Sequence, residues 1–345
     1  MDYKESGVDI DAGNEAVRRI SELARGTFTA GVLSEIGSFG GLFRPDLSGL
    51  TNPVLVSSAD GVGTKLKVAF RTGRHDTVGG DLVNHCVNDI LVQGARPLFF
   101  LDYVATGRLS PGVTADVVAG MAAACVDNGC ALLGGETAEM PGFYADGEYD
   151  LAGFIVGLVD RAAIIDGRDV APGDIIVGLP SIGLHTNGYS LARRILFDYL
   201  GLTVDSVVEE LGGSIGDELL RPHCSYLRAM WPVVETGAVK AMAHITGGGL
   251  TGNVPRVLPE GCMARIDPET WPVPPIFTFL RERGEVPVDD MYRTFNMGIG
   301  MTLVCAKADV SRVLSALISG GEVGAVPIGE IREGSPAVEY AHWDR

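Results

Sequence analysis

The chain has 345 residues, which is longer than one typical domain and agrees with two. Its net charge of −17 excludes a general nucleic-acid or anionic-membrane surface, although a local phosphate site bridged by a metal stays compatible with it. Six cysteines without a C-x-x-C pair, a polar N-terminus and the lack of a long apolar run predict a cytoplasmic protein without a membrane span.

The N-terminal stretch is predicted to be irregular before the first helix. Residues 7–14 mix glycines, carboxylates and apolar side chains without a helical period, whereas the apolar spacing over Glu15–Ala24 predicts a short helix. Residues 26–52 are glycine-rich and are predicted to be loop. The segment 7–14 is either a frayed terminus or a flap that closes over a ligand, and its candidate lid residues are Gly7, Asp9, Asp11, Gly13 and Asn14.

A polar, glycine-containing stretch follows the first predicted strand, Pro53–Val56. It reads Ser58-Ala59-Asp60-Gly61-Val62-Gly63-Thr64-Lys65. Glycines allow positive φ and close backbone approach to a ligand, lysine could meet phosphate, and aspartate could hold a hard cation. The spacing is not that of a Walker A loop. The stretch is therefore either a plain turn that carries Asp and Lys or a cation and phosphate site.

The next predicted helix, Thr77–Gly94, combines an apolar stripe with a polar series. The polar residues are Asp81, Asn84, His85, Asn88 and Asp89, and several of them share a face by the three-or-four spacing. Asp and Asn are poor interior helix formers. Their number in one helix indicates a functional use of that face.

A second glycine-rich acidic stretch follows a later strand. The predicted elements are a strand over Pro97–Thr106, a helix over Pro111–Asn128 and a strand over Ala131–Leu133, followed by the expected turn Gly134-Gly135-Glu136-Thr137. If both acidic turns lie at the ends of neighbouring strands, Asp60 and Glu136 come close together. The alternative is two unrelated acidic turns. A further apolar strand is predicted over Asp150–Asp160.

The second half restarts after the turn-rich segment Asp166–Gly173. Strands are expected over Asp174–Leu179, Lys240–His244, Cys262–Ile266 and Gly298–Cys305, and helices from Ser190 to Asp198 and over His223–Glu235, Asn253–Leu258, Pro275–Arg283 and Asp309–Leu317. Two polar loops stand out, namely His185-Thr186-Asn187-Gly188 and His244-Ile245-Thr246-Gly247-Gly248-Gly249. Each precedes a helix and could bind an anion there, although His185 could equally be a surface or capping residue.

These residue types favour one kind of chemistry. Carboxylates such as Asp60, Asp81, Asp89 and Glu136 suit Mg²⁺, which usually retains waters and bridges substrate phosphates. The second half adds imidazoles beside anion-binding loops. Together they indicate ATP-dependent activation of a phosphorylated substrate.

Seven motifs, taken together, resemble the phosphoribosylformylglycinamidine cyclo-ligase (aminoimidazole ribonucleotide synthetase) family. They occur in the family order and span nearly the whole chain, at residues 7–14, 60–65, 86–89, 134–142, 185–190, 244–249 and 291–296. The resemblance implies a two-domain α+β fold. Its N-terminal domain, residues 1–168, would bind ATP and Mg²⁺ and pair its sheet with that of a second copy in a dimer barrel. Its C-terminal α/β sandwich domain, residues 169–345, would bind substrate.

The implied reaction is ATP-dependent cyclisation of formylglycinamidine ribonucleotide to aminoimidazole ribonucleotide in purine biosynthesis, through an iminophosphate. The candidate catalytic residues are Lys65, Asp89, His185 and His244, and the candidate metal ligands are Asp60, Asp81 and Glu136. ATP phosphates are expected at Asp60, Gly61, Gly63, Thr64, Lys65, Gly134, Gly135 and Thr137. The substrate is expected at Thr186, Asn187, Thr246, Gly247, Gly248 and Gly249.

Related families with a similar core are less similar to this sequence, and the amidotransferase of the preceding purine step has a longer chain, at least in its large form. Selenophosphate synthetases need an early reactive cysteine or selenocysteine, but the first cysteine here is Cys86. Thiamine-monophosphate kinases share the architecture without the 7–14 and 244–249 motifs in this form. A non-catalytic nucleotide-binding homodimer of the same fold is the alternative from another class. ATP turnover that depends on formylglycinamidine ribonucleotide separates it from the enzyme.

Overall fold

The computed structural model describes residues 10–342. The chain divides into two compact units, one made of Met1–Leu91 and Ala95–Ala163 and the other of Val92–Gly94 and Ile164–Arg345. The expected domain division after residue 168 stays a prediction. Within the described residues, no helix is both long and apolar enough to span a membrane.

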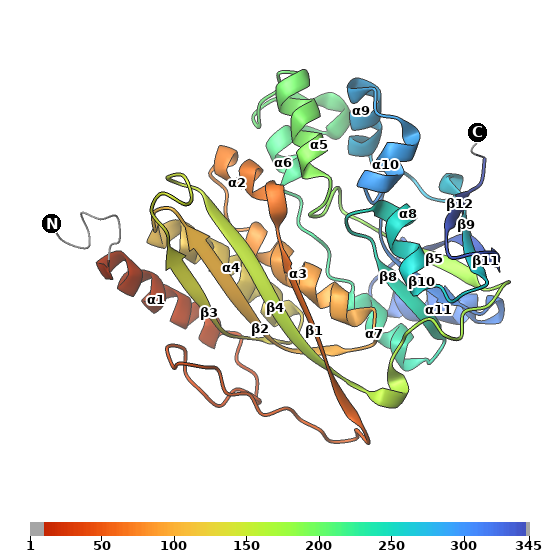
Figure 1. Ribbon diagram of the computed structural model, residues 1–345, viewed down its shortest axis with the longest axis horizontal. Coiled ribbons are helices and arrows are strands. Elements are labelled where there is room, and N and C mark those ends of the chain that lie inside the picture. Colours follow the sequence, from red (N-terminus) through yellow and green to blue (C-terminus); the bar gives the residue numbers. More distant parts are fainter. Residues whose placement is uncertain (1–9, 343–345) are drawn as a thin grey trace. The chain divides into compact units, whose positions relative to one another are not determined.

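The first unit is built on a four-stranded sheet in the order β1-β4-β2-β3 (Figure 1). Its strands are β1 (Pro53–Gly61), β2 (Arg96–Thr106), β3 (Ala131–Glu139) and β4 (Tyr149–Asp160). β4 pairs antiparallel with both β1 and β2, whereas β2 and β3 are parallel and joined through helix α4 (Pro111–Asp127). A crossover helix is the usual connection between parallel neighbours.

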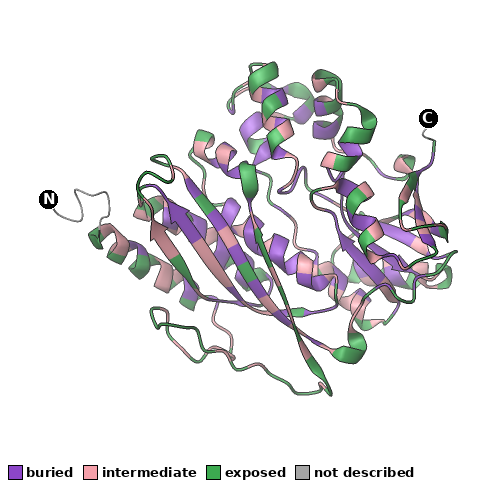
Figure 2. Ribbon diagram, viewed as in Figure 1, coloured by how far each residue is buried: buried purple, intermediate pink, exposed green. Residues whose placement is uncertain are grey.

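Helices cover one face of this sheet. α3 (Val78–Leu91) packs on β1, β2 and β4, α4 packs on α3 and β3, and α1 (Ile10–Arg25) packs on α4 and β3. Gly153 of β4 lets α3 approach, because a Cβ there would lie 2.3 Å from Phe100 Cζ and 3.0 Å from Leu82 Cγ. Figure 2 shows α3 mostly buried, while β4 alternates between its two faces. The alternation is that of a sheet with one covered face.

Three expectations for the first unit were wrong in their boundaries. The described part of α1 begins at Ile10 rather than Glu15, and Ile10 lies seven residues before Val17 on the same helical face. Glu15 is inside the helix, where it pairs with Arg18 and Arg19. β1 continues through Asp60 to Gly61. β3 continues to Glu139, so the expected glycine turn at residues 134–137 is part of a strand. The helices expected at 77–94 and 111–128 and the strands expected at 97–106 and 150–160 are confirmed within three residues at each end.

The second unit contains a six-stranded sheet in the order β12-β9-β11-β5-β10-β8. Its strands are β5 (Ile175–Pro180), β8 (Val239–His244), β9 (Cys262–Ile266), β10 (Ile299–Cys305), β11 (Val326–Glu333) and β12 (Val338–Tyr340). All pairs are antiparallel except β12 with β9. Every residue of β10 is buried, as expected for a central strand.

Short helices surround this sheet. They are α5 (Tyr189–Arg193), α6 (Ile215–Leu219), α7 (Leu227–Glu235), α8 (Gly249–Asn253), α9 (Pro275–Gly284), α10 (Val288–Thr294) and α11 (Val310–Ser319). The expected helix at 253–258 is wrong, since α8 begins four residues earlier and passes into a 3-10 turn at 254–257. The helix expected from His223 begins only at Leu227, which leaves His223 in a loop. β11, β12 and the small β6-β7 ribbon (Val207–Val208 and Gly213–Ser214) were not predicted.

Candidate functional site

One face of α3 holds the segment 58–65 through three side chains spaced four residues apart. Asp81 Oδ2 lies 2.7 Å from Lys65 Nζ, His85 Nε2 lies 2.7 Å from Asp60 Oδ2, and Asp89 Oδ2 accepts a hydrogen bond of 2.8 Å from Ser58. A spacing of four places these side chains on one helical face. The sequence pattern on this helix is thus explained by a row of contacts to the end of β1.

The first of these contacts is a buried ion pair. The side chains of Lys65 and Asp81 are both 0% exposed. This does not support the expectation that Lys65 meets phosphate and that Asp81 holds a metal ion, because each charge is already balanced by the other inside the core. Burying an ion pair is costly unless its geometry is good, so its role here is to fix α3 against residues 63–65.

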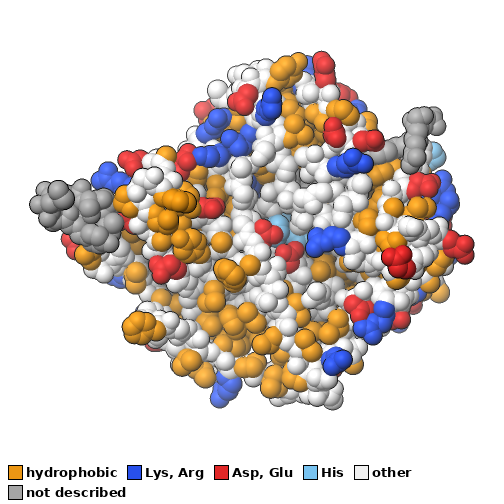
Figure 3. All heavy atoms as spheres, in the orientation of Figure 1, with side chains coloured by type: hydrophobic (Ala, Val, Ile, Leu, Met, Phe, Trp, Pro, Cys, Tyr) orange, Lys and Arg blue, Asp and Glu red, His pale blue; other side chains and the backbone are white. Residues whose placement is uncertain are grey.

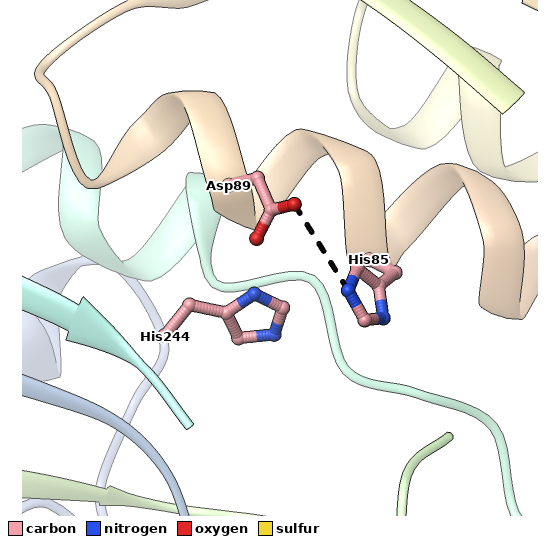
Figure 4. Close-up of side chains that lie close together, drawn as sticks. All are labelled: His85, Asp89 and His244. Carbon is pink, nitrogen blue, oxygen red and sulfur yellow. Dashed lines mark ion pairs between the residues drawn. The ribbon is translucent and has the colours of Figure 1, made fainter. Parts of the chain in front are cut away.

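The second and third contacts lie nearer to solvent. His85 is buried between two carboxylates, with Asp89 Oδ2 at 4.0 Å from the same Nε2 atom (Figure 4). Burial alone would lower the pKa of His85, but its hydrogen bond to Asp60 and the charges of Asp60, Asp89 and Asp81 raise it. Burial alone would raise the pKa of Asp60, but the hydrogen bond and charge of His85 and the Gly61 N–H lower it. The site therefore favours an imidazolium between two carboxylates.

This donor set fits a hard divalent cation. The side chains of Asp60 and Asp89 are 44% and 26% exposed, and each carries an acidic oxygen next to the imidazolium of His85. Mg²⁺ prefers one or two carboxylates together with waters and phosphate oxygens. A cation there would replace the positive charge that His85 supplies. Asp60 and Asp89 are accordingly the metal ligands that the geometry favours.

Glu136 does not join this cluster within one chain. The register aligns Asp60 with Gly153, Gly153 with Asp102, and Asp102 with Gly135. Three strand spacings of about 4.8 Å each separate β1 from β3, which is about 14 Å, and neighbouring residues of β3 point to opposite faces. The strand order therefore does not support one metal site shared by Asp60 and Glu136 within a single chain, because β1 and β3 are not neighbours. A shared site stays a prediction.

The residues around Glu136 line a separate pocket of about 770 Å³. Gly134, Gly135, Glu136 and Thr137 of β3 contribute to it, together with α1 and residues 35–41. Gly135 has a packing reason to be glycine, since a Cβ there would lie 2.1 Å from Asp102 Oδ1. The predicted phosphate residues are thus divided between the end of β1 and this pocket.

Asp102, which also lines the pocket, is an acid in an apolar setting. Burial raises the pKa of Asp102 to about 7. The charge of Glu136 also raises this pKa, whereas a hydrogen bond from the backbone N–H of Asp102 lowers it. The sequence signal for this residue was only an aspartate inside a predicted strand. A buried carboxylate with a raised pKa is typical of functional sites, although structural positions show the same shift.

In the second unit, the structure brings the two polar loops together. A Cβ built on Gly247 would lie 3.3 Å from Asn187 Oδ1, so the loops 185–188 and 245–249 are neighbours. Asn253 holds the second loop, because its amide donates to the carbonyl oxygens of Thr246, Gly247 and Gly249. This juxtaposition supports a single site in the second unit for Thr186, Asn187 and residues 246–249.

Glycine is required in these loops for backbone and packing reasons. Gly248 has φ +100° and Gly249 has φ +58°, and a Cβ on Gly249 would lie 2.1 Å from the carbonyl oxygen of Tyr292. Gly188, with φ +78°, would place a Cβ 2.3 Å from Phe295 Cε1. The glycines therefore explain the loop shape without a ligand, and anion binding there stays a prediction.

Three histidines of the second unit form a buried cluster. His185, His223 and His244 are 0%, 0% and 6% exposed. The rings of His185 and His223 stack at 4.2 Å between centroids, and those of His223 and His244 meet edge to face at 5.1 Å. At an effective dielectric constant of about 20, two imidazolium charges about 4 Å apart repel by about 4 kcal/mol. The cluster thus favours at most one charge on the stacked pair.

His185 has a defined tautomer. Its Nε2 atom accepts a hydrogen bond of 3.3 Å from the backbone N–H of Ile182, so the ring proton is on Nδ1. His185 itself has φ +61°, an uncommon backbone conformation for a residue other than glycine. His223 is the residue of this cluster that the sequence analysis missed, since no glycine-containing loop or repeated motif accompanies it.

The candidate lid is only partly described. Gly7 and Asp9 lie outside the described residues. Asp11, Gly13 and Asn14 lie in the first turns of α1, where the absence of a helical period had suggested a flap. The expectation of an irregular segment is wrong for residues 10–14, because the helix that packs on α4 and β3 extends through them.

Comparison with known proteins agrees with both units. Residues 46–159 match the model of the AIR synthase related protein N-terminal domain, and residues 171–341 match that of the AIR synthase related protein C-terminal domain. The phosphoribosylformylglycinamidine cyclo-ligase of Syntrophotalea carbinolica is 54% identical over 342 residues, covering 98% of this chain and 97% of that protein. That of Trichlorobacter lovleyi is 56% identical over 330 residues, covering 96% and 94%.

Solved structures share the fold at low identity. A thiamine-monophosphate kinase from Stenotrophomonas maltophilia K279a superposes with a TM-score of 0.69 at 19% identity, covering 95% of this chain and 96% of that one. The hydrogenase maturation protein HypE in complex with ATP gives 0.66 at 19% identity, covering 94% and 91%. These two likenesses concern the fold alone. The family models and the relatives with more than half of their residues identical go further, and the chain belongs to the phosphoribosylformylglycinamidine cyclo-ligase family.

Proposed function

We propose that the chain catalyses the ATP-dependent cyclisation of formylglycinamidine ribonucleotide to aminoimidazole ribonucleotide, with release of ADP and phosphate, in purine biosynthesis. The observation that carries this is identity of 54–56% to cyclo-ligases across both units. The reaction needs a nucleotide site with carboxylates and a substrate site with proton-transfer groups. We assign the nucleotide site with its carboxylates to the first unit and the substrate site with its proton-transfer groups to the second unit.

In the first unit, Asp60 and Asp89 would hold Mg²⁺ with ATP. The bound metal ion would offset the negative charge that develops on the transferring phosphoryl group. His85 holds Asp60 in place and lowers its pKa until the nucleotide binds, through a hydrogen bond to that carboxylate, while Asp89 lies 4.0 Å from the same ring nitrogen. Lys65 supports this arrangement from the core through Asp81, rather than as a phosphate ligand.

In the second unit, Thr186, Asn187 and the loop 246–249 would bind the substrate, with His244 at the end of β8 beside them. ATP phosphorylates the formyl oxygen, an amidine nitrogen attacks the resulting iminophosphate carbon, and phosphate leaves. The amidine nitrogen loses a proton as the ring closes, and a buried imidazole such as His244 is suited to accept it. Holding the chain of the substrate folded for ring closure lowers the barrier further.

A homodimer through the four-stranded sheet completes the proposal. Within the described residues, helices cover one face of this sheet, while Leu55 and Phe154 on the other face are 65% and 51% exposed. The residues of β2 and β4 that share that face are also apolar and only partly buried, namely Phe99, Leu101, Ala152, Val156 and Leu158. Hydrophobic side chains gather over this region in Figure 3. An apolar sheet face of this kind fits a second copy of the same sheet.

The six cysteines are consistent with a cytoplasmic location for this dimer. All six are free thiols, and five of them are buried. Proteins of oxidising compartments more often carry disulfides.

The decisive experiment measures ADP and aminoimidazole ribonucleotide from the purified chain with ATP, Mg²⁺ and formylglycinamidine ribonucleotide. We expect equal amounts of both products. Asp89→Asn and His244→Ala should each lower turnover by about 10²-fold, the usual scale for the loss of one electrostatic or acid–base group. Asp116→Asn is the matched control, because Asp116 is exposed on α4.

Two outcomes would contradict the proposal. ATP binding without any aminoimidazole ribonucleotide would favour the non-catalytic nucleotide-binding dimer. A raised Michaelis constant with unchanged turnover in His244→Ala would make His244 a binding contact rather than a proton-transfer group.

A further inference from the structure

His223 is a buried, polar residue to which the proposed reaction assigns no role. It lies in the loop between α6 and α7, and its side chain is 0% exposed. Histidine is seldom chosen to fill an apolar core, because each ring nitrogen then needs a hydrogen-bonding partner. The contacts of His223 therefore indicate what the residue is for.

Both ring nitrogens of His223 are engaged. Its Nδ1 atom lies 3.2 Å from Thr186 Oγ1, and its Nε2 atom lies 3.0 Å from Nε2 of His244. A hydrogen bond between two imidazole nitrogens needs one proton shared by the pair. The proton on one ring therefore determines the tautomer of the other. When His223 carries its proton on Nδ1 and donates it to the hydroxyl of Thr186, its Nε2 atom accepts the Nε2 proton of His244, and Nδ1 of His244 is left as a proton acceptor.

The position of the His223 ring is also fixed. The ring of His185 stacks on it at an interplanar angle of 27°, and His185 is held in turn by the backbone of Ile182. Gly300 of β10 makes room for this packing, because a Cβ there would lie 2.6 Å from Cε1 of His185. A ring held in this way presents its Nε2 atom to His244 in one direction.

We propose that His223 is a positioning residue for His244, which fixes its ring orientation and tautomer through the Nε2–Nε2 hydrogen bond. His244 then exchanges protons with the substrate through Nδ1. The link to the loop 185–188 runs through Thr186, so a substrate that contacts Thr186 also sets the protonation pattern of His244. This inference rests on the proposed function of His244, although the tautomer itself can be observed without turnover.

The test uses three substitutions that remove different parts of these contacts. His223→Gln retains an amide near the position of Nε2, His223→Asn retains one near Nδ1, and His223→Ala retains neither. We expect His223→Gln to keep most of the turnover. The other two should lose about 10–100-fold in kcat, the usual effect of removing a partner that orients a histidine, with KM changed less than about threefold. Thermal unfolding of each variant identifies any that fail to fold.

The second readout is the imidazole nitrogen chemical shifts of His244 in histidine-labelled full-length protein, assigned with His244→Asn. We expect one tautomer in the wild type and in His223→Gln, and a mixture in His223→Asn. His342→Gln, which alters an exposed histidine of the same unit, is the control and should change neither readout.

An unchanged His244 tautomer in all folded His223 variants would overturn the proposal, as would equal loss of kcat in the Gln and Asn variants. The absence of product from the wild type would instead refute the proposed function. The chemical shifts would still test the positioning role in that case.

Discussion

The buried Lys65–Asp81 pair gives the sharpest test of how the first unit is held together. Both side chains are 0% exposed, and their charged atoms are 2.7 Å apart. Lys65→Met keeps the length of the side chain and removes its charge, and Asp81→Asn keeps the shape and removes the other charge. Each change leaves a net charge in the core where the two charges had balanced.

The expected cost follows from burial. Removing one member of a buried ion pair typically costs about 3–5 kcal/mol, whereas replacing both is far less damaging, so the double variant should recover at least about 1 kcal/mol relative to either single variant. Lys67 and Glu148 form the matched control pair at 2.6 Å, with side chains 41% and 35% exposed. Lys67→Met should cost no more than about 1 kcal/mol.

Urea unfolding of the five proteins, followed by circular dichroism, measures these differences. Turnover of the folded double variant then separates the two roles of Lys65. We expect it to stay within about tenfold of the wild type, since a tenfold change is only about 1.4 kcal/mol of transition-state free energy. A cost below about 1 kcal/mol for Lys65→Met would refute the buried-pair reasoning. A stable double variant without activity would instead make Lys65 a direct participant.

Three further predictions concern single positions. Burial raises the pKa of Asp102 from 3.8 to about 7, so the free energy of unfolding should fall as pH rises through that range. In urea unfolding at pH 8, Asp102→Asn should have a free energy of unfolding up to about 4 kcal/mol above that of the wild type. At pH 4 the two proteins should be equally stable. Gly300→Ala should lower stability by about 1–3 kcal/mol in thermal unfolding, because its Cβ would lie 2.1 Å from Tyr226 Oη, whereas Gly252→Ala, with nothing within 4 Å, should not. Hydrogen bonds from the backbone N–H groups of Ala162, Asn52 and Thr51 lower the pKa of Asp160 to about 2, so the stability lost in Asp160→Asn should shrink as pH falls from about 4 towards 2; a constant difference would contradict this.

Much of the fold could be predicted from the sequence because its elements carry strong periodic patterns. The apolar stripe of α3 and the largely apolar run of β10, interrupted only by Thr302 and a glycine, each give one clear interpretation. The predicted strand ends at Leu133, six residues before the end of β3, because Gly134 and Gly135 are typical of a turn. Gly135 is instead a strand residue beside Asp102, a reason that only the partner strand reveals.

The same limit applies to the sites. The polar face of α3 and the loops at 185 and 244 could be identified, since several functional residue types occur at short spacing in each. Sequence could not show that Lys65 is paired with Asp81, because a lysine beside two glycines reads equally well as a phosphate ligand. The strand order, which separates Asp60 from Glu136, depends on long-range pairing that no local pattern encodes.

The row of contacts along α3 has a mechanical consequence. Three side chains on successive turns each form an ion pair or a hydrogen bond with a different residue of the segment 58–65. A slide of the helix by one residue would turn each of them by about 100° and break all three contacts at once. The helix and the end of β1 are therefore expected to move together as one rigid unit. A nucleotide that draws Asp60 away from His85 must do so by rotating side chains, while the backbone beneath them keeps its place.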